Sequence, residues 1–191
     1  MLIARILLPV HSLGPGERVC IWTQGCNKRC KGCISPELQP FFGNEIDESV
    51  LSNIITKAAR KSDCKGITIS GGDPFEQPQS LLKLLRLLRN EFDDILVYTG
   101  YELSDIQDGL VGTEAKMCLE YLDVLIDGKY IDELNYRSCV LRGSSNQKIH
   151  FINKRLVLIY AKYMKQGRIL ESFVHNKDTI VTGILNKEEP K

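Results

Sequence analysis

The chain has 191 residues, of which 43% are hydrophobic and 26% charged, values that suit one soluble domain with its own core. The formal net charge of +1 argues against binding of nucleic acid through bulk charge. No apolar run approaches the roughly 18–20 residues that span a bilayer. Residues 1–10 are apolar but carry neither a basic leader nor a small-residue cleavage site, so we expect a cytoplasmic protein without a membrane anchor.

The N-terminal part of the chain predicts two strands and a helix. Residues 1–10 are expected to form an opening strand, and the apolar run 19–23 a second strand. Between them, residues 12–18 contain Gly-Pro-Gly and predict a turn-rich loop. Asp47 can cap a helix over residues 48–61. The predicted apolar face of that helix consists of Val50, Leu51, Ile54, Ile55 and Ala58.

Strand and helix patterns then alternate up to residue 128. Strands are expected at 66–70, 95–100 and 123–128, and helices at 78–91 and 113–122. Such alternation predicts a parallel sheet with crossover helices, and the leucine stripe of 78–91 should pack on it. Four parallel strands are too few for an eight-stranded barrel of roughly 250 residues. The predicted fold is therefore α/β, a partial, open β/α barrel with its site at the C-terminal ends of the strands.

The pattern weakens beyond residue 128. The expected elements are a polar loop at 142–147, a strand at 156–160, and a hairpin of 168–174 and 179–184 around His175-Asn176-Lys177-Asp178. We therefore divide the chain into a partial-barrel core, residues 1–150, and a β-rich extension, residues 151–191, packed on the same domain.

Three cysteines dominate the sequence. Cys26, Cys30 and Cys33 follow the strand 19–23 directly, in a short basic loop. Thiolates this close favour an iron–sulfur cluster or zinc and require a reducing compartment. Three of them can hold three corners of a [4Fe–4S] cluster and leave one iron open. A structural zinc usually takes four protein ligands, so a zinc-stabilised binding module is the less favoured alternative. The remaining cysteines are expected to be small buried hydrophobes: Cys20, Cys64, Cys118 and Cys139.

Four chemically distinctive loops follow the predicted strands. They are the cysteine loop, Gly71-Gly72-Asp73-Pro74, Thr99-Gly100-Tyr101 and Asp127-Gly128. Because the carboxyl ends of parallel strands lie at one edge of a sheet, we expect these loops to share one face. The paired glycines permit a close approach to a ligand, and Asp73 offers an acceptor to an ammonium group. An ordinary strand-to-helix turn is the alternative.

The motif Cys-x3-Cys-x2-Cys after a first strand resembles the signature of radical S-adenosylmethionine enzymes. The lead-in Gly14-Pro15-Gly16-Glu17-Arg18 is similar to that of glycyl-radical activating enzymes. Further matching segments appear in the same order: Ser70–Pro74, Tyr98–Tyr101, Asp123–Lys129 and Arg142–Gln147. Together these residues resemble the family of activating enzymes of anaerobic ribonucleoside-triphosphate reductases, over about residues 13–150.

This resemblance implies a set of cofactor contacts. Cys26, Cys30 and Cys33 would hold a [4Fe–4S] cluster that receives an electron from a flavodoxin or ferredoxin-type donor. The methionine end of S-adenosylmethionine would bind at Gly71, Gly72 and Asp73. Thr99 and Asp127 are candidates for the ribose, the sulfonium or an associated cation, and Arg142 is a candidate for a carboxylate. A solvated turn residue is the alternative for Asp127, and a loop-stabilising surface arginine for Arg142.

The implied activity is reductive cleavage of S-adenosylmethionine to a 5′-deoxyadenosyl radical, which generates a glycyl radical on a larger partner enzyme. The alternative is a radical enzyme that modifies a peptide, a protein or a small molecule directly; the extra residues 151–191 favour it. The basic residues Lys28, Arg29 and Lys31 are candidates for tuning the cluster or for meeting the partner or reductant. A solvated basic loop is the alternative for these three residues.

Overall fold

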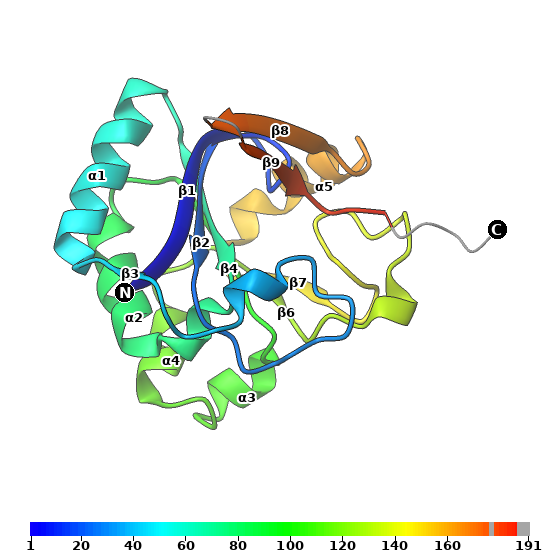
Figure 1. Ribbon diagram of the computed structural model, residues 1–191, viewed down its shortest axis with the longest axis horizontal. Helices are drawn as coiled ribbons and strands as arrows, with labels where there is room; N and C mark the ends of the chain where they lie inside the picture. Colours follow the sequence, from blue (N-terminus) through cyan, green and yellow to red (C-terminus); the bar gives the residue numbers. More distant parts are fainter. Residues whose placement is uncertain (176–177, 187–191) are drawn as a thin grey trace.

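A seven-stranded sheet forms the centre of the computed structural model, which describes residues 1–175 and 178–186 (Figure 1). Its strands, in spatial order, are β3 (Asn44–Glu45), β1 (Leu2–Val10), β2 (Arg18–Thr23), β4 (Gly66–Gly71), β5 (Asp94–Tyr98), β6 (Val124–Asp127) and β7 (Lys148–Phe151). The four strands β2, β4, β5 and β6 run parallel, whereas β1, β3 and β7 pair antiparallel at the two sides. The predicted α/β fold with a parallel core is confirmed. Curvature into a partial barrel stays a prediction.

Helices cover both faces of the sheet (Figure 1). Because successive side chains of a strand point to opposite faces, each central strand contributes residues to a core on either side. Ile95 and Val97 of β5 belong to the core on one face, under α1 (Glu48–Lys61), α2 (Pro78–Leu88) and α4 (Thr113–Cys118). Leu96 of the same strand belongs to a second core under α5 (Val157–Met164). The α2 leucines in the first core are Leu81, Leu82, Leu84, Leu85 and Leu88, so the predicted packing of this stripe is confirmed.

Helix α1 begins where the sequence predicts. The carboxylate of Asp47 accepts hydrogen bonds from the backbone N–H groups of Ser49 and Val50. Its predicted apolar face is partly wrong: Val50 is 52% exposed and Ile54 is 50% exposed. The contact with the core is made by residues spaced four apart, Leu51, Ile55 and Ala59, which form one row along a helix.

The predicted strand at residues 156–160 is wrong. These residues form the end of a short 3-10 helix, Lys154–Leu156, and the start of α5. Tyr160 and Tyr163 are buried while Leu158 is 81% exposed, which is the spacing of a helix face and not of a strand. A short apolar run cannot separate the two structures by itself. The extension is therefore a helix followed by a hairpin.

The predicted C-terminal hairpin is confirmed as β8 (Leu170–His175) and β9 (Asp178–Gly183), a separate two-stranded sheet; its tip, residues 176–177, lies outside the described residues. Glu171 fastens the hairpin to the loop after β1, because its carboxylate accepts the N–H groups of His11 and Ser12 at 2.8 and 2.7 Å. The hydroxyls of Ser12 and Thr182 lie 2.9 Å apart. The hairpin thus packs over the start of the sheet (Figure 1).

A buried ion pair closes the N-terminal end of the parallel strands. The guanidinium of Arg18 is fully buried and lies 2.5 Å from the carboxylate of Asp94. It also donates to the hydroxyl of Thr68 and the carbonyl of Ile67, both at 2.7 Å. The hydroxyl of Tyr160 donates to the same carboxylate at 2.9 Å. Arg18 therefore links β2, β5 and α5, far from the C-terminal ends of the strands.

Shorter elements complete the fold. They are α3 (Leu103–Gln107) and the 3-10 helices η1 (Pro36–Leu38), η2 (Pro74–Glu76) and η3 (Asp132–Leu134). The sequence did not predict α3, β3 or β7. Within the part of the chain that the structure describes, none of the helices has the length and apolar character to cross a membrane.

Candidate functional site

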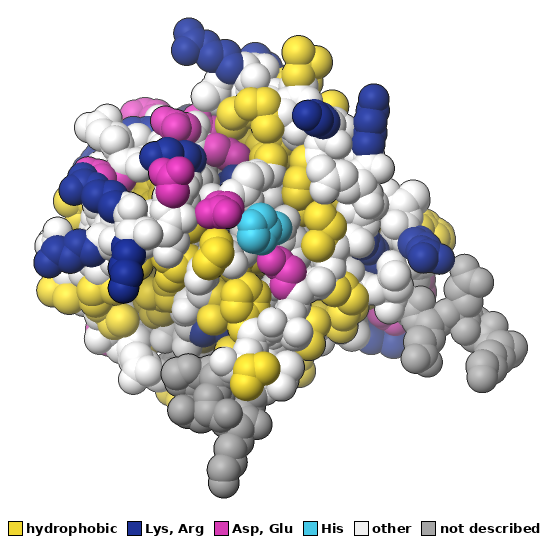
Figure 2. Space-filling model, turned by 90° about the horizontal axis from the view of Figure 1, so that it is seen from above, with side chains coloured by type: hydrophobic (Ala, Val, Ile, Leu, Met, Phe, Trp, Pro, Cys, Tyr) yellow, Lys and Arg dark blue, Asp and Glu magenta, His cyan; other side chains and the backbone are white. Residues whose placement is uncertain are grey.

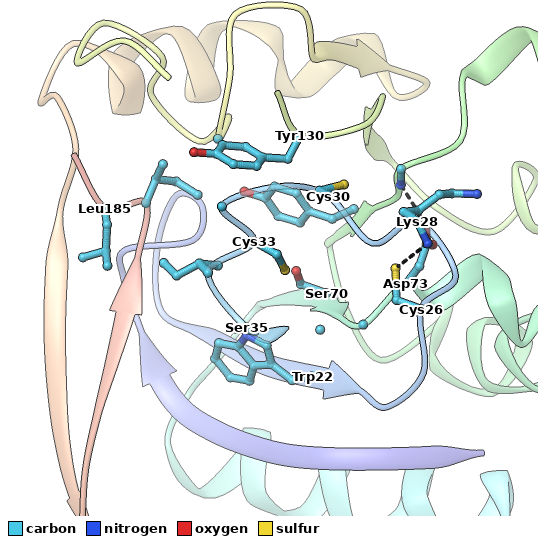
Figure 3. Close-up of a pocket in the computed structure, with 18 of the residues that line it drawn as sticks. Trp22, Cys26, Lys28, Cys30, Cys33, Ser35, Ser70, Asp73, Tyr130 and Leu185 are labelled. Atoms are coloured by element: carbon cyan, nitrogen blue, oxygen red, sulfur yellow. Dashed lines mark hydrogen bonds between the residues drawn. The ribbon is translucent and has the colours of Figure 1, made fainter. Parts of the chain in front are cut away.

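A cavity of about 670 Å³ lies at the C-terminal ends of β2, β4 and β5 (Figure 3). All four distinctive loops reach it, so the prediction that they share one face is confirmed. The residues of these loops that line it are Cys26, Lys28, Cys30, Gly32, Cys33, Gly71, Gly72, Asp73, Pro74, Thr99, Gly100 and Gly128. The cysteines lie between Tyr130 on one side of the cavity and Trp22 on the other (Figure 3).

The cysteine loop is fixed at its start by backbone contacts. The N–H of Gly25 donates to the carbonyl of Leu38 at 2.8 Å, and that of Cys26 donates to the carbonyl of Gln39 at 2.9 Å. Gly25 has a φ of 103°, and a side chain here would meet the ring of Phe41. The loop therefore leaves β2 in a conformation that favours glycine.

All three thiols of the loop are free and partly exposed. Burial raises the pKa of Cys26 to about 11, against the opposing effect of the Lys28 N–H group, and burial also raises the pKa of Cys30. These two thiols are therefore protonated at neutral pH, and a metal must displace their protons to bind.

The set of donors suits an iron–sulfur cluster, in which each cysteine thiolate binds a different iron. Cys26, Cys30 and Cys33 are three such donors on one loop, and all three side chains line one cavity. Across residues 1–175 and 178–186, no three His, Cys, Asp or Glu side chains are grouped so as to hold a single metal ion.

The predicted glycine turn brings two loops into contact. A side chain on Gly72 would overlap the carbonyl oxygen of Gly25, and one on Gly71 would overlap the backbone of Thr23. The N–H of Gly72 donates to the carbonyl of Thr23 at 2.8 Å, and that of Asp73 donates to the carbonyl of Gly25 at 2.9 Å. Gly71 is thus required by the close approach of β4 to the end of β2, and Gly72 by its close approach to the start of the cysteine loop.

Asp73 connects the ends of β4 and β5. Its carboxylate, 1% exposed, accepts the N–H of Phe75 at 3.0 Å and that of Gly100 at 2.8 Å. The hydroxyl of Thr99 donates to it at 3.0 Å. Burial raises the pKa of Asp73 to about 6, although these hydrogen bonds oppose the shift. Asp73 therefore positions the two loops, and its predicted contact with an ammonium group stays a prediction.

Asp127 and Arg142 do not line the cavity. Asp127 is 1% exposed, and its Oδ2 accepts the N–H of Leu103 at 2.7 Å. Nε2 of His150 lies 3.0 Å from the same oxygen. The alternative of a solvated turn residue is therefore wrong. The half-buried Arg142 donates to the carbonyl of Gln147 at 3.0 Å, which stabilises its own loop. Ligand binding by either residue stays a prediction.

Sequence reasoning missed the side chain that holds the first part of the cysteine loop. Glu76 of η2 accepts the side-chain amide of Asn27 at 3.0 Å and the hydroxyl of Tyr101 at 3.2 Å. The Lys28 ammonium lies 2.8 Å from the centre of the Tyr101 ring and 3.8 Å from Glu76. A solvated basic loop is thus wrong for Lys28, whereas Lys31 is 83% exposed and pairs with Glu133.

The sequence also gave no sign that the C-terminal extension reaches the site. The cavity is lined by Thr179, Val181, Thr182, Gly183, Ile184, Leu185 and Asn186. Their distance along the chain from the cysteines explains why no local pattern could reveal this contact.

Most of the chain is similar to known proteins. Residues 12–150 match a family model described as "4Fe-4S single cluster domain". Three similar curated proteins are each named anaerobic ribonucleoside-triphosphate reductase-activating protein. The one from Haemophilus influenzae is 35% identical over 143 residues, covering 72% of this chain and 89% of that protein. Those from Escherichia coli K12 and Enterobacteria phage T4 are 31% and 32% identical, covering 73% and 71% of this chain and 91% and 85% of theirs.

Proposed function

This chain belongs to the family of anaerobic ribonucleoside-triphosphate reductase-activating proteins, and we propose from that premise that it generates a glycyl radical on an anaerobic ribonucleotide reductase. One observation carries the proposal. The three cysteines, the Gly71-Gly72-Asp73 turn and the Thr99-Gly100 loop line one cavity at the C-terminal ends of the parallel strands. This is the face on which such folds bind their ligands.

Two cofactors would share the cavity. Cys26, Cys30 and Cys33 would hold a [4Fe–4S] cluster, and Gly71 and Gly72 would lie along the methionine end of S-adenosylmethionine. When bound, and given one electron from a flavodoxin or ferredoxin-type protein, these groups would supply the chemistry for reductive cleavage of S-adenosylmethionine to methionine and a 5′-deoxyadenosyl radical, with 5′-deoxyadenosine and a glycyl radical on the partner as the products of hydrogen-atom transfer.

The contribution of the chain's own residues is to position and to shield. Asp73 and Thr99 hold the ends of β4 and β5 in one arrangement through their direct hydrogen bond. Trp22, Tyr98 and Tyr130 line the cavity and offer aromatic surface that excludes water. Thr99 is the favoured candidate for the ribose or the sulfonium. Asp127 would influence the site indirectly, by accepting the N–H of Leu103 at the start of α3. Arg142 would do so by stabilising the loop that contains it.

Electron paramagnetic resonance tests the proposal. The cluster-loaded protein is reduced anaerobically and mixed with S-adenosylmethionine and the anaerobic ribonucleotide reductase of the same organism. A carbon-centred doublet is expected on the reductase. Cys30→Ser should abolish it, whereas Cys64→Ser should retain it, because the Cys64 thiol is a small buried group away from the cavity. Formation of 5′-deoxyadenosine without any doublet would contradict the proposed function. Because the cluster cysteines must stay reduced, the proposed function also favours the cytoplasm as the compartment of the protein.

A second candidate function is direct modification of a peptide, a protein or a small molecule by the same radical chemistry. The observation in its favour is that the extension lines the cavity from Thr179 to Asn186. A substrate converted in the absence of any reductase would support it. Metal analysis separates both functions from a zinc-stabilised binding module: about one zinc per chain and no sulfide would contradict both radical functions.

A further inference from the structure

Strand β9 borders the cavity along its edge. Side chains of successive residues point to opposite faces of a strand, so a cavity against one face contacts every second residue. Val181, Thr182 and Gly183 are consecutive and all line the cavity. Both faces and the backbone between them are therefore beside it.

The edge of β9 that faces the cavity is its unpaired edge. β9 pairs with β8 along the other edge, from Leu170 with Gly183 to His175 with Asp178. Among the described residues, β8 is the only strand partner of β9, and no β8 residue lines the cavity. In an antiparallel ladder every second residue directs its N–H and C=O to the same side. The cavity side of β9 thus carries backbone donors and acceptors that no other described strand pairs with; of its cavity-lining residues, Thr179 and Val181 are exposed and Thr182 is buried.

The hairpin is held firmly enough to act as a template. Besides the Glu171 and Thr182 contacts with the loop after β1, Phe173 and Ile184 pack against the small core around Val10 and Leu13. The outward face of the hairpin keeps apolar side chains in solvent: Leu170, Val174 and Val181 are 49, 77 and 54% exposed. Figure 2 looks onto this side of the molecule and shows apolar side chains around a His and acidic side chains at its middle, with Lys and Arg mostly toward its periphery.

This arrangement is additional to the family core. The family model ends at residue 150. The relatives named above align with about 72% of this chain, and the aligned part makes up 85–91% of their own length. Residues 179–186, beyond the matched part, thus contribute a wall to a cavity whose cysteines and glycine turn lie within it. A free strand edge is otherwise a liability that proteins cover or charge.

We propose that the unpaired edge of β9 binds the glycine-bearing segment of the partner enzyme as an added antiparallel or parallel strand, which delivers that glycine to the cavity. This inference rests on the proposed function. Strand addition suits it, since main-chain hydrogen bonds provide affinity for an extended segment whatever its side chains. An extended segment along β9 also holds its α-carbons at fixed positions beside the cysteine loop.

Peptide binding tests the proposal. A fluorescent peptide spanning the glycine loop of the reductase is titrated against the cluster-loaded protein with S-adenosylmethionine, and anisotropy gives its affinity. N-methylation then removes one backbone donor at a time. Along an added strand only alternate N–H groups bond to β9, so we expect affinity losses of about five- to tenfold at every second residue. The peptides methylated at the intervening residues are the matched controls.

A pair of protein variants tests the same contact from the other side. Val174 and Val181 lie on one face of the hairpin, since Val174 pairs with Thr179 and Ser172 pairs with Val181, but only Val181 lines the cavity. Val181→Asp should weaken peptide binding about tenfold, and Val174→Asp should stay within about twofold of the unsubstituted protein. Both variants are compared at equal cluster content.

The outcomes distinguish this proposal from the function on which it rests. Alternate-residue losses together with a selective effect of Val181→Asp support strand addition. Equal effects of the two aspartates, or losses without alternation, overturn it if the unsubstituted protein still produces the doublet on the reductase. Absence of both peptide binding and doublet overturns the proposed function, and strand addition with it.

Discussion

Replacing Asp94 by asparagine should destabilise the protein more than any surface substitution of the same type. The change keeps the shape of the side chain but leaves the Arg18 guanidinium, which is fully buried, without its counter-charge. Breaking a buried pair in this way costs about 3–5 kcal/mol, and the lower end applies because the amide oxygen still accepts a hydrogen bond. For a chain of this length, about 3 kcal/mol corresponds to a fall in Tm of roughly 6–12 °C.

The assay is thermal unfolding of the cluster-loaded protein by circular dichroism under anaerobic conditions. The matched control is Asp93→Asn, the same change at the neighbouring exposed residue. Tyr160→Phe removes the α5 hydroxyl from the same carboxylate and should lower the stability by about 1.5–3 kcal/mol. Equal Tm values for Asp94→Asn and Asp93→Asn would refute the claim that this ion pair joins β2, β5 and α5.

Three further predictions concern the cysteine loop. Gly72→Ala should reduce iron and sulfide per chain several-fold, because its methyl group overlaps a backbone oxygen of that loop. Gly109→Ala meets nothing within 4 Å, and although its φ of 78° makes the change strained, it should not reduce the iron and sulfide content. Glu76→Gln should make the cluster midpoint potential more positive in a redox titration, since a negative charge beside the loop is lost; Glu120→Gln, at an exposed residue that does not line the cavity, is its control. Removal of the cluster with a chelator should increase hydrogen exchange in residues 24–43 and leave the strands protected.

The position of the site could be predicted from the sequence because it depends on local patterns and one topological rule. The spacing of Cys26, Cys30 and Cys33 indicated a cluster, and strand and helix alternation placed the later loops at the same edge of the sheet. The structure confirms that shared edge. The Asp47 cap and the α2 leucine stripe were likewise local signals.

The remaining features depend on contacts between distant residues. The bond between Thr99 and Asp73 spans 26 residues, and that between Tyr160 and Asp94 spans 66. The second contact explains the wrong strand at 156–160, because a buried acceptor for Tyr160 favours the helix that presents it. No local pattern could show that β9 lines the same cavity as the cysteine loop either, since the hairpin had to be placed first.

Isotope transfer tests the central claim most directly. The reductase is produced with glycine that carries deuterium at its α-carbon and is mixed with the reduced protein and S-adenosylmethionine. Mass spectrometry of the released 5′-deoxyadenosine should show one deuterium gained in each turnover that forms a glycyl radical. Recovery of 5′-deoxyadenosine without deuterium, while the glycyl doublet appears, would contradict direct hydrogen abstraction from the glycine of the partner.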